Sequence, residues 1–425
     1  MMILVYQVLW QIIPYFLKKY LIKRSRLSSE YLNHWDERFG KPFLSPVTNC
    51  IWIHAVSVGE NRAAESVISL LRKQYPDVSF LITQMTPTGR DIAKKIYPFA
   101  QCRYLPYDKK SYVQQFLKDH KPIMALFMET EIWPNFLFEL RKQNIHTFLV
   151  NARMSEKSYS GYRKIKRLSE QVMQCFDKIF VQTQKDLHYF QQLGATAIEV
   201  MGSIKYDIDI KTEHKQLAEQ FQNKIEDSNR PIIVCGSTRV EDGINEAYLL
   251  LDEWKKHYST ALLVIVPRHP EVFESVYNYS VELGFNTVRR SDCPSIKSDV
   301  QVVIGDSMQE LMSYYLCANI AFVGGSLVNK GCHNILEPIA CEIPTIFGYS
   351  TYNFEQVCED AVNAGCAVKI SDAVQWYQKI VELLENDFFY QNMQINTKQF
   401  INQHQGASVK TVSKIVSVFD TEEEA

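Results

Sequence analysis

Several signatures of common protein classes are missing from this chain of 425 residues. Its ten cysteines form no C-x-x-C pair and no zinc-type spacing with histidine, so reduced thiols in the cytosol are the simplest interpretation. No G-x-G-x-x-G opens the first helix of either half and no G-x-x-x-x-G-K-[ST] occurs, which argues against a dinucleotide oxidoreductase and a P-loop nucleotidase. With 46 Lys and Arg against 48 Asp and Glu, the net charge of -2 provides no global positive field, and nucleic acid is not an expected partner.

The length and composition predict two sizeable globular domains. At about 150 residues per domain, a single hydrophobic core is not expected for this chain. Hydrophobic residues make up 46% of the sequence and charged residues 22%, which is ordinary globular usage and enough apolar material for two cores.

The N-terminal segment is the one long apolar run. Residues 1–17 are almost wholly apolar, but no small-residue cleavage site follows and no charge precedes them, so a secretory signal is not indicated. The basic residues that come next are Lys18, Lys19, Lys23, Arg24 and Arg26. Residues 1–26 are therefore predicted to be a membrane-anchor helix with a basic flank on the cytoplasmic side, attracted by anionic lipids of the inner membrane. The helix could span the bilayer or lie in its interface, and the alternative is a helix packed on the protein's own surface.

The rest of the chain alternates short apolar runs with amphipathic segments. The predicted strands are residues 51–54, 78–83, 123–128, 147–150, 178–181 and 198–201, then 231–235, 261–266, 302–305, 320–323 and 345–347. The predicted helices are residues 61–74, 88–95, 109–120, 135–143 and 158–174, then 243–257, 272–284, 307–316 and 335–341. This pattern predicts two α/β domains with parallel, doubly wound sheets, separated by a polar stretch over 207–230. The predicted boundaries are 27–210 and 211–400, with a C-terminal helix and acidic tail over 401–425.

Loops after strands should carry the chemistry, since ligands bind at the carboxyl ends of such sheets. Glu60 follows the first strand and begins a helix, where it is a candidate general base or, equally, a first-turn residue that stabilises the helix dipole. Thr86, Thr88, Gly89 and Arg90 follow the second strand and could hold a phosphate, although a simple helix cap is favoured.

Two carboxylates, Glu129 and Glu131, end a very apolar strand, where charge is costly unless paired or used, so a function is favoured. Arg153 is a plausible salt-bridge partner or anion contact.

In the second half, small and cationic residues occupy the equivalent loops. Ser237 lies in a small-residue strand end, and Arg268 and His269 are potential phosphate partners. Gly324, Gly325 and Ser326 follow a strand and precede a helix that begins near Asn334 and Glu337. Exposed N–H groups and a positive helix end there suit a nucleotide's phosphate, and the Glu can accept both ribose hydroxyls.

The loops contain eight segments in a characteristic order: HAVSVGE (54–60), residues 83–89, ETEIWPN (129–135), NARMS (151–155), GSIKYD (202–207), PRHP (267–270), residues 324–327 and HNILEP (333–338). The order and spacing of these segments resemble those of the 3-deoxy-D-manno-octulosonic acid (Kdo) transferases over nearly the whole chain.

This resemblance implies a GT-B glycosyltransferase, with two Rossmann-like domains facing a cleft, that moves Kdo from CMP-Kdo to the lipid A precursor at the cytoplasmic face of the inner membrane. It implies that Glu60 is the catalytic base, that the first domain takes the lipid acceptor, and that the second takes the donor. Arg268 and Lys205 are implied as phosphate contacts. We expect no cofactor and no metal, because no Asp-x-Asp motif is placed to bridge the nucleotide.

Three positions depart from the family pattern. Cys332 and Glu342 stand where glycine is usual, and Arg239 stands where histidine is frequent. A Cβ at residue 332 would matter if the turn needs a positive φ. Two alternatives stay open at this point: another GT-B enzyme that uses a UDP-sugar, and an inactive membrane-attached binding module.

Overall fold

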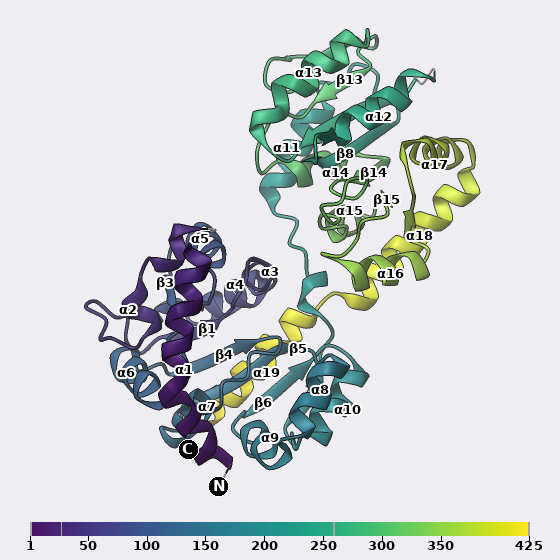
Figure 1. Cartoon of the computed structure of the whole chain (residues 1–425). Helices are drawn as coiled ribbons and strands as arrows, with labels where there is room; N and C mark the ends of the chain where they lie inside the picture. The colour runs from purple at the N-terminus through teal and green to yellow at the C-terminus, as the bar shows by residue number, and fades with distance from the viewer. Residues whose placement is uncertain (1, 27, 258–259, 424–425) are drawn as a thin grey trace. The chain divides into compact units, whose positions relative to one another are not determined.

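The computed structural model describes residues 2–26, 28–257 and 260–423, which fall into two compact units (Figure 1). The first unit runs to Asp207 and takes up the chain again from Gln405, and the second is Ile208–His404. Each unit is built on a seven-stranded sheet in which every pairing is parallel. The predicted fold of two Rossmann-like α/β domains is confirmed.

The first sheet has its earliest strand near its centre. In spatial order its strands are β3 (Gln101–Tyr104), β2 (Phe80–Gln84), β1 (Ile51–His54), β4 (Met124–Met128), β5 (His146–Ala152), β6 (Lys178–Val181) and β7 (Ile198–Val200). The helices are α1 (Met2–Ser25), η1 (Ser29–Leu32), α2 (Trp35–Arg38), α3 (Val58–Ala63), α4 (Glu65–Gln74), α5 (Pro87–Ile96), α6 (Lys110–His120), α7 (Pro134–Lys142), α8 (Glu156–Arg163), α9 (Lys166–Met173), α10 (Gln184–Gln192), η2 (Ile204–Tyr206) and α19 (Ala407–Glu423). Trp52 and Ile53 point into different apolar clusters, so both faces of the sheet are covered.

The second sheet repeats the plan. Its strands in spatial order are β12 (Thr287–Arg289), β13 (Val302–Ile304), β11 (Leu262–Pro267), β8 (Ile232–Thr238), β14 (Ile320–Val323), β15 (Thr345–Phe347) and β16 (Ala367–Lys369), and a small hairpin pairs β9 (Val240–Glu241) with β10 (Ile244–Asn245). The helices are α11 (Thr212–Gln222), α12 (Glu246–Lys255), η3 (Pro270–Val272), α13 (Phe273–Glu282), α14 (Leu311–Cys317), α15 (Leu336–Ala340), α16 (Glu355–Asn363), α17 (Ala373–Glu385) and α18 (Asp387–His404). The polar stretch over 207–230 is therefore not only a connection, because α11 lies inside it and buries Phe221 against α14.

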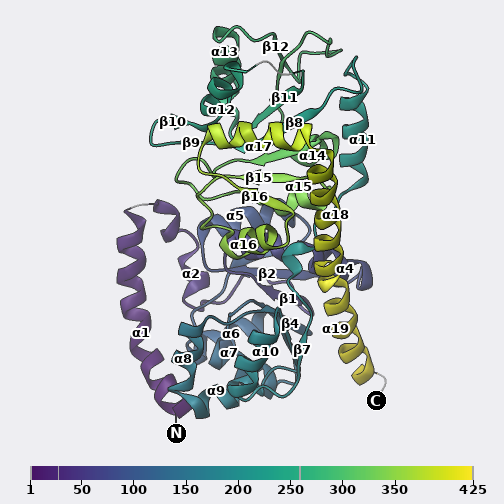
Figure 2. The same cartoon turned by 90° about the vertical axis from the view of Figure 1, so that its right-hand side faces the viewer.

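The last helix returns to the first unit. α19 lies beside α4 (Figures 1 and 2), where Ser66 and Ser408 hydroxyls are 2.6 Å apart and the Tyr75 hydroxyl donates to Asp420 at 3.0 Å. Ile415 and Phe419 join the core of that face. Glu424, the end of the predicted acidic tail, lies outside the described residues.

The N-terminal helix α1 packs along the first unit by one side only. Trp10 and Leu21 are buried with Phe39 and Tyr107, and the Tyr6 hydroxyl donates to Asp108 at 2.8 Å. Nine large apolar side chains on its other side are exposed: Leu4, Val5, Val8, Leu9, Ile12, Tyr15, Phe16, Tyr20 and Ile22. Within the ranges described, no helix combines the length and apolar character needed for a membrane crossing.

Candidate active site

The first candidate site lies where the order of the first sheet reverses. β1 pairs with β2 on one side and with β4 on the other, so the loops that leave β1 and β4 diverge at the carboxyl edge. Glu60, Glu129 and Glu131 all come from these two loops. The charges of Glu131 and Glu129 both act on Glu60, which is consistent with three carboxylates grouped at this edge.

Glu60 is held by its own loop. Ser57 caps α3, and its hydroxyl donates to Glu60 Oε1 at 2.9 Å while the Val56 N–H donates to Oε2 at 2.9 Å. The side chain is partly exposed. Burial raises the pKa of Glu60, the charges of Glu131 and Glu129 raise it further, and the two hydrogen bonds oppose them. The carboxylate is therefore fixed in place and a stronger base than an ordinary surface glutamate.

Glu131 is oriented by aromatic and imidazole groups. Its Oε2 accepts from Trp133 Nε1 at 2.8 Å and lies 3.5 Å from His54 Nε2. His54 is fully buried at the end of β1, with Nδ1 2.9 Å from the Thr83 hydroxyl. Neither His54 nor Trp133 was predicted as a site residue, although they lie inside the motifs HAVSVGE and ETEIWPN.

Glu129 is neutralised by two cations. Arg153 Nε lies 2.8 Å from its Oε2, and Lys205 Nζ lies 2.8 Å from its Oε1. Glu129 also has a φ of 52°, a backbone conformation that costs free energy and is characteristic of functional strand ends. Lys205, predicted with the donor residues, is thus placed in the first unit beside a predicted acceptor residue.

The loop after β2 has a mainly structural arrangement. Thr86 caps α5 and accepts the Gly89 N–H at 3.1 Å, whereas Thr88 is exposed. Arg90 is buried, donates to Glu37 at 2.9 Å and lies 4.7 Å from the Tyr104 ring centre. These contacts match the helix cap that the sequence favoured and argue against Arg90 as a contact for the acceptor.

The second candidate site lies at the corresponding reversal, between β8 and β14. Gly324 packs so closely on the end of β8 that a Cβ would lie 2.5 Å from the Ser237 carbonyl oxygen. Ser237 has a φ of 56°. The Ser326 hydroxyl donates to the Val323 carbonyl at 2.6 Å and accepts the Gly348 N–H at 2.8 Å.

The N–H groups of this glycine loop are not free, contrary to the expectation from sequence. Gly325, Ser326 and Leu327 donate to the carboxylate of Glu246 at 2.7, 3.1 and 2.8 Å. Glu246 is fully buried in the first turn of α12. Sequence reasoning missed this residue, although its position after the first strand of its domain matches that of Glu60.

The remaining predicted donor residues of the second unit lie in the loop after β11 and at the start of α15. His269 lies 3.9 Å from Glu271, and the Arg268 N–H donates to Thr238 at 3.0 Å. Asn334 accepts the Leu336 N–H at 3.1 Å and lies 3.5 Å from Glu337. The unit therefore brings Ser237, the glycine loop and the start of α15 to one edge.

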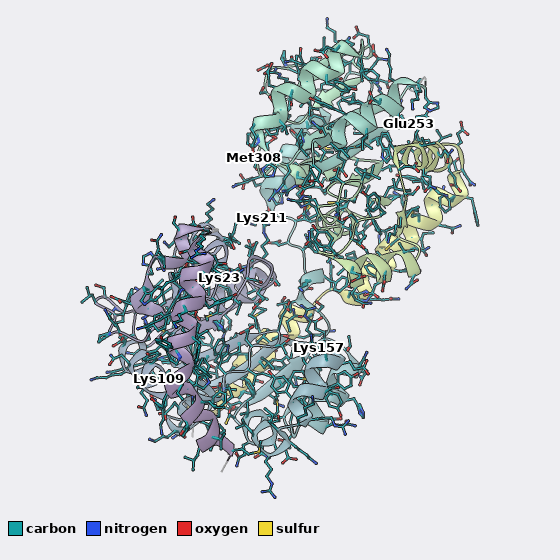
Figure 3. The ribbon with its side chains drawn as sticks, in the orientation of Figure 1. Lys23, Lys109, Lys157, Lys211, Glu253 and Met308 are labelled. Atoms are coloured by element: carbon teal, nitrogen blue, oxygen red, sulfur yellow. The ribbon has the colours of Figure 1, made fainter. Side chains whose placement is uncertain are left out.

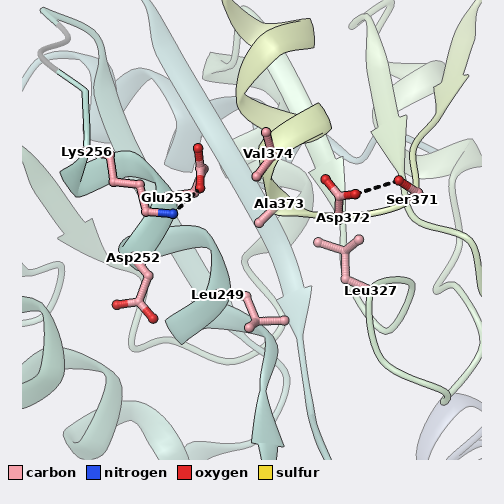
Figure 4. A pocket seen from close by; sticks show the side chains of 9 residues that line it. All are labelled: Leu249, Asp252, Glu253, Lys256, Leu327, Ser371, Asp372, Ala373 and Val374. Atoms are coloured by element: carbon pink, nitrogen blue, oxygen red, sulfur yellow. Dashed lines mark hydrogen bonds and ion pairs between the residues drawn. The ribbon is translucent and has the colours of Figure 1, made fainter.

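A separate pocket of about 360 Å³ lies between α12 and the start of α17 (Figure 4). Leu249 and Lys256 form one wall, Asp372 and Val374 the other, and Leu327 contributes to the lining. None of the nine described residues that line it is a predicted donor residue. Among side chains with a described placement, no group of three or more His, Cys, Asp and Glu gathers as a metal site.

The departures from the family pattern have different structural outcomes. Cys332 is not among the described residues with a positive φ, so its Cβ creates no strain of that kind. Glu342, at the other usual glycine position, does adopt a φ of 61°. The strain therefore falls at the end of α15 rather than at the turn beside the glycine loop.

Similarity to known proteins agrees with this arrangement. The family described as 3-deoxy-D-manno-octulosonic-acid transferase (kdotransferase) matches residues 33–208. The 3-deoxy-D-manno-octulosonic acid transferase of Haemophilus influenzae is 33% identical over 370 residues, or 84% of this chain and 85% of that protein. The enzyme of the same name from Bordetella pertussis is 31% identical over 388 residues, or 89% of each chain.

A solved structure supports the fold alone. The UDP-GlcNAc 2-epimerase of Neisseria meningitidis, bound to UDP-GlcNAc, aligns with a TM-score of 0.54 at 16% identity over 89% of this chain and all of that one. The sequence similarity decides the family: this chain belongs to the 3-deoxy-D-manno-octulosonic acid transferases, a family of glycosyltransferases.

Proposed function

We propose that this protein transfers Kdo from CMP-Kdo to the lipid A precursor lipid IVA, with inversion at the anomeric carbon. The observation that carries the proposal is the 33% identity to a 3-deoxy-D-manno-octulosonic acid transferase over 84% of the chain. The fixed, partly exposed carboxylate of Glu60 at the reversal point of the first sheet supplies the base that such a reaction needs.

In the proposed step, Glu60 takes the proton of an acceptor hydroxyl. The acceptor oxygen then bonds to the anomeric carbon of Kdo while the bond from that carbon to the phosphate oxygen breaks, and CMP leaves with the electron pair. One hydrogen bond to each Glu60 oxygen leaves further lone pairs for the hydroxyl. The raised pKa of Glu60 brings it nearer to neutral pH, where a general base is most effective.

Among the three carboxylates, Glu60 is the best suited to this role. Glu129 is committed to Arg153 and Lys205, and Glu131 to Trp133 beside His54. No ion pair to Glu60 is found within the described ranges. Glu129 and Glu131 then act by raising the basicity of Glu60, since like charges disfavour its ionised form.

The donor is assigned to the second domain and the lipid to the first. Ser237, Arg268, His269, the loop over 324–326, Asn334 and Glu337 form the proposed donor site, and Glu129, Glu131 and Arg153 support the acceptor side. The best test incubates purified protein with CMP-Kdo and lipid IVA and weighs the lipid product. A mass gain of one or more Kdo units is expected, with inhibition by CMP and not by UDP. Transfer from a UDP-sugar instead would contradict the proposal.

We further propose that α1 holds the enzyme at the cytoplasmic face of the inner membrane. Its exposed apolar side is followed by exposed Lys18, Lys19, Lys23 and Arg24, a combination that favours an anionic membrane interface. Figure 3 labels Lys23 near the end of this helix.

Flotation with vesicles tests this attachment. Phe16→Glu should reduce binding to vesicles that contain anionic phospholipid, whereas Val409→Glu, at an equally exposed apolar position in α19, should not. Equal flotation of both variants and the parent protein would contradict attachment through α1.

A further inference from the structure

The backbone N–H groups of the glycine loop over 324–327 all donate hydrogen bonds within the second domain. The Gly324 N–H donates to the Gly236 carbonyl at 2.8 Å, and the next three N–H groups donate to Glu246. A phosphate would have to displace the carboxylate of Glu246 to use them. The negative charge of a sugar nucleotide must therefore be bound by other groups at this edge.

Glu246 does more than close the loop. Each of its oxygens accepts two N–H groups: Ser326 and Leu327 donate to Oε1, while Gly325 and Arg239 donate to Oε2, the latter at 3.1 Å. A second bond, from the Glu246 N–H to the Arg239 carbonyl at 2.9 Å, fixes residue 239 from both sides. The end of β8 and the glycine loop are thus tied together through one buried side chain.

The side chain of Arg239 is placed beside this loop. Its Nη1 lies 3.5 Å from His333 Nε2, and a Cβ at Gly325 would lie 3.4 Å from the same nitrogen. A guanidinium offers N–H donors and no acceptor, so His333 Nε2 is the acceptor of this contact. Arg239 Nε is buried and has no hydrogen-bond partner among the residues whose placement is described. The Arg239 side chain as a whole is partly exposed, so its planar guanidinium is available to a phosphate.

Other charged groups act at this edge. Burial lowers the pKa of His269, the charges of Arg239, Arg268 and Lys330 lower it further, and the charge of Glu271 raises it. Lys330 is paired with Glu241 of the small hairpin at 2.8 Å, so its charge is largely balanced. Arg239 has no acidic partner among the described ion pairs.

We propose that Arg239 binds the phosphate of the sugar nucleotide and that Glu246 is the positioning residue that holds Arg239 and the glycine loop in register for it. This inference rests on the proposed function and identifies the phosphate contact of its donor site. From the sequence, loop N–H groups were expected to bind the phosphate. We assign that role instead to the side chain of Arg239, at a position where the family frequently has histidine.

The first experiment measures CMP binding by calorimetry on the full chain. Arg239→Ala should weaken CMP binding at least about tenfold, because a charged hydrogen bond to phosphate is lost. Arg239→Lys should recover part of the affinity, since it keeps the charge without the planar fork. Arg289→Ala, which removes an edge-strand arginine paired with Glu274, is the matched control and should bind CMP as the parent does.

The second experiment tests positioning with a double-mutant cycle. Glu246→Gln places an NH2 group against two N–H donors whichever way the amide turns, so the loop or residue 239 must shift. We expect a raised KM for CMP-Kdo, an unchanged KM for the lipid, and a much smaller effect when Arg239 is already alanine. Glu253→Gln is the control, because Glu253 is buried on the same helix (Figure 3) but pairs with Lys256 and His257.

The outcomes separate this inference from the proposed function. If the parent enzyme neither binds CMP nor transfers Kdo, the proposed function fails. If the parent is active but Arg239→Ala binds CMP equally well, or loses affinity only for intact CMP-Kdo, the phosphate contact is wrong. Should Glu246→Gln fail to fold, the binding of CMP by Arg239→Ala still decides whether Arg239 binds the phosphate. Equal effects of Glu246→Gln with and without Arg239 would overturn the positioning role.

Discussion

Each of the two domains has a glutamate at an equivalent place, but the surroundings of the two side chains differ. In each, the first strand of the sheet leads to a helix whose first turn carries a glutamate: β1 leads to Glu60 in α3, and β8 leads to Glu246 in α12. Glu60 accepts one hydrogen bond at each oxygen and is partly exposed. Glu246 accepts two at each oxygen and is fully buried.

If Glu60 is the base that we propose, the number of donors, and not the position in the fold, separates it from the structural carboxylate of Glu246. Burial raises the pKa of both side chains, for Glu246 to about 7. The four N–H groups around Glu246 leave it no acceptor capacity, because a carboxylate has about four lone-pair sites. Glu60 retains that capacity and is partly exposed, which is why we propose Glu60, and not Glu246, as the group that takes a proton from a substrate.

The largest expected effect is on Glu60 itself. Glu60→Gln should lower kcat by about 10²- to 10⁴-fold, the range for loss of a general base, because the amide cannot accept the proton. The fold and CMP binding should be unchanged, since the Gln oxygen can still accept one of the two local hydrogen bonds. Radiolabelled transfer and CMP calorimetry measure the two properties.

The matched control is Glu156→Gln. Glu156 also lies in the first turn of a helix capped by serine in the first domain, but it is exposed and its charge is not among those that shift the pKa of Glu60. It should retain full activity. A Glu60→Gln enzyme with normal kcat would remove the distinction between the two glutamates.

A second carboxylate of the first domain resembles Glu246 and should behave as a structural group. Asp108 is fully buried and accepts from the N–H groups of Asn135 and Phe136 and from the Tyr6 hydroxyl, at 2.8–3.0 Å. Asp108→Ala leaves these donors unpaired and should lower the free energy of unfolding by about 3 kcal/mol. Urea denaturation measures it, with exposed Asp91→Ala expected to change stability by less than about 0.5 kcal/mol. Equal stability of the two variants would contradict this interpretation.

The sequence pattern predicted the central strands of both sheets but not three of the strands at their edges. Strands such as β1, β6 and β14 were predicted with their observed bounds, because both faces are buried and their sequences are continuous apolar runs. The parallel strands β3, β12 and β16 were missed, and each lies at a sheet edge. β3 even contains the buried Arg103, which lies 4.3 Å from the Phe43 ring centre, and a charge of that kind interrupts the apolar pattern.

The carboxylates of the candidate site were predicted from the sequence, but the hydrogen bonds and ion pairs between its residues were not. Glu60, Glu129 and Glu131 were found because carboxylates at strand ends are conspicuous in a sequence. The hydrogen bonds of Glu246 to a loop about 80 residues away were not, since they depend on the order of strands in the second sheet. Local patterning also gave no sign that Arg90 would be buried against Glu37 or that Lys205 would meet Glu129.

The smallest expected effect is a shift in pH dependence. Lys205→Ala removes one of two cations from Glu129, so more of its negative charge reaches Glu60 and the pKa of Glu60 rises further. The base must be deprotonated, so activity falls below this pKa, and the acid limb of kcat/KM should move to higher pH. At pH values above the limb, the variant should match the parent.

Two alternatives are separated by the same pH profile. Lys178→Ala breaks a comparable ion pair of the first domain, with Glu199 at 3.0 Å, and should leave the limb unmoved. If Lys205 instead contacts the donor phosphate, as the resemblance implied, its loss should raise the KM for CMP-Kdo at every pH without moving the limb. That result would assign Lys205 to the donor. It would also leave Arg153 as the only cation, among the residues described, whose pairing with Glu129 influences Glu60.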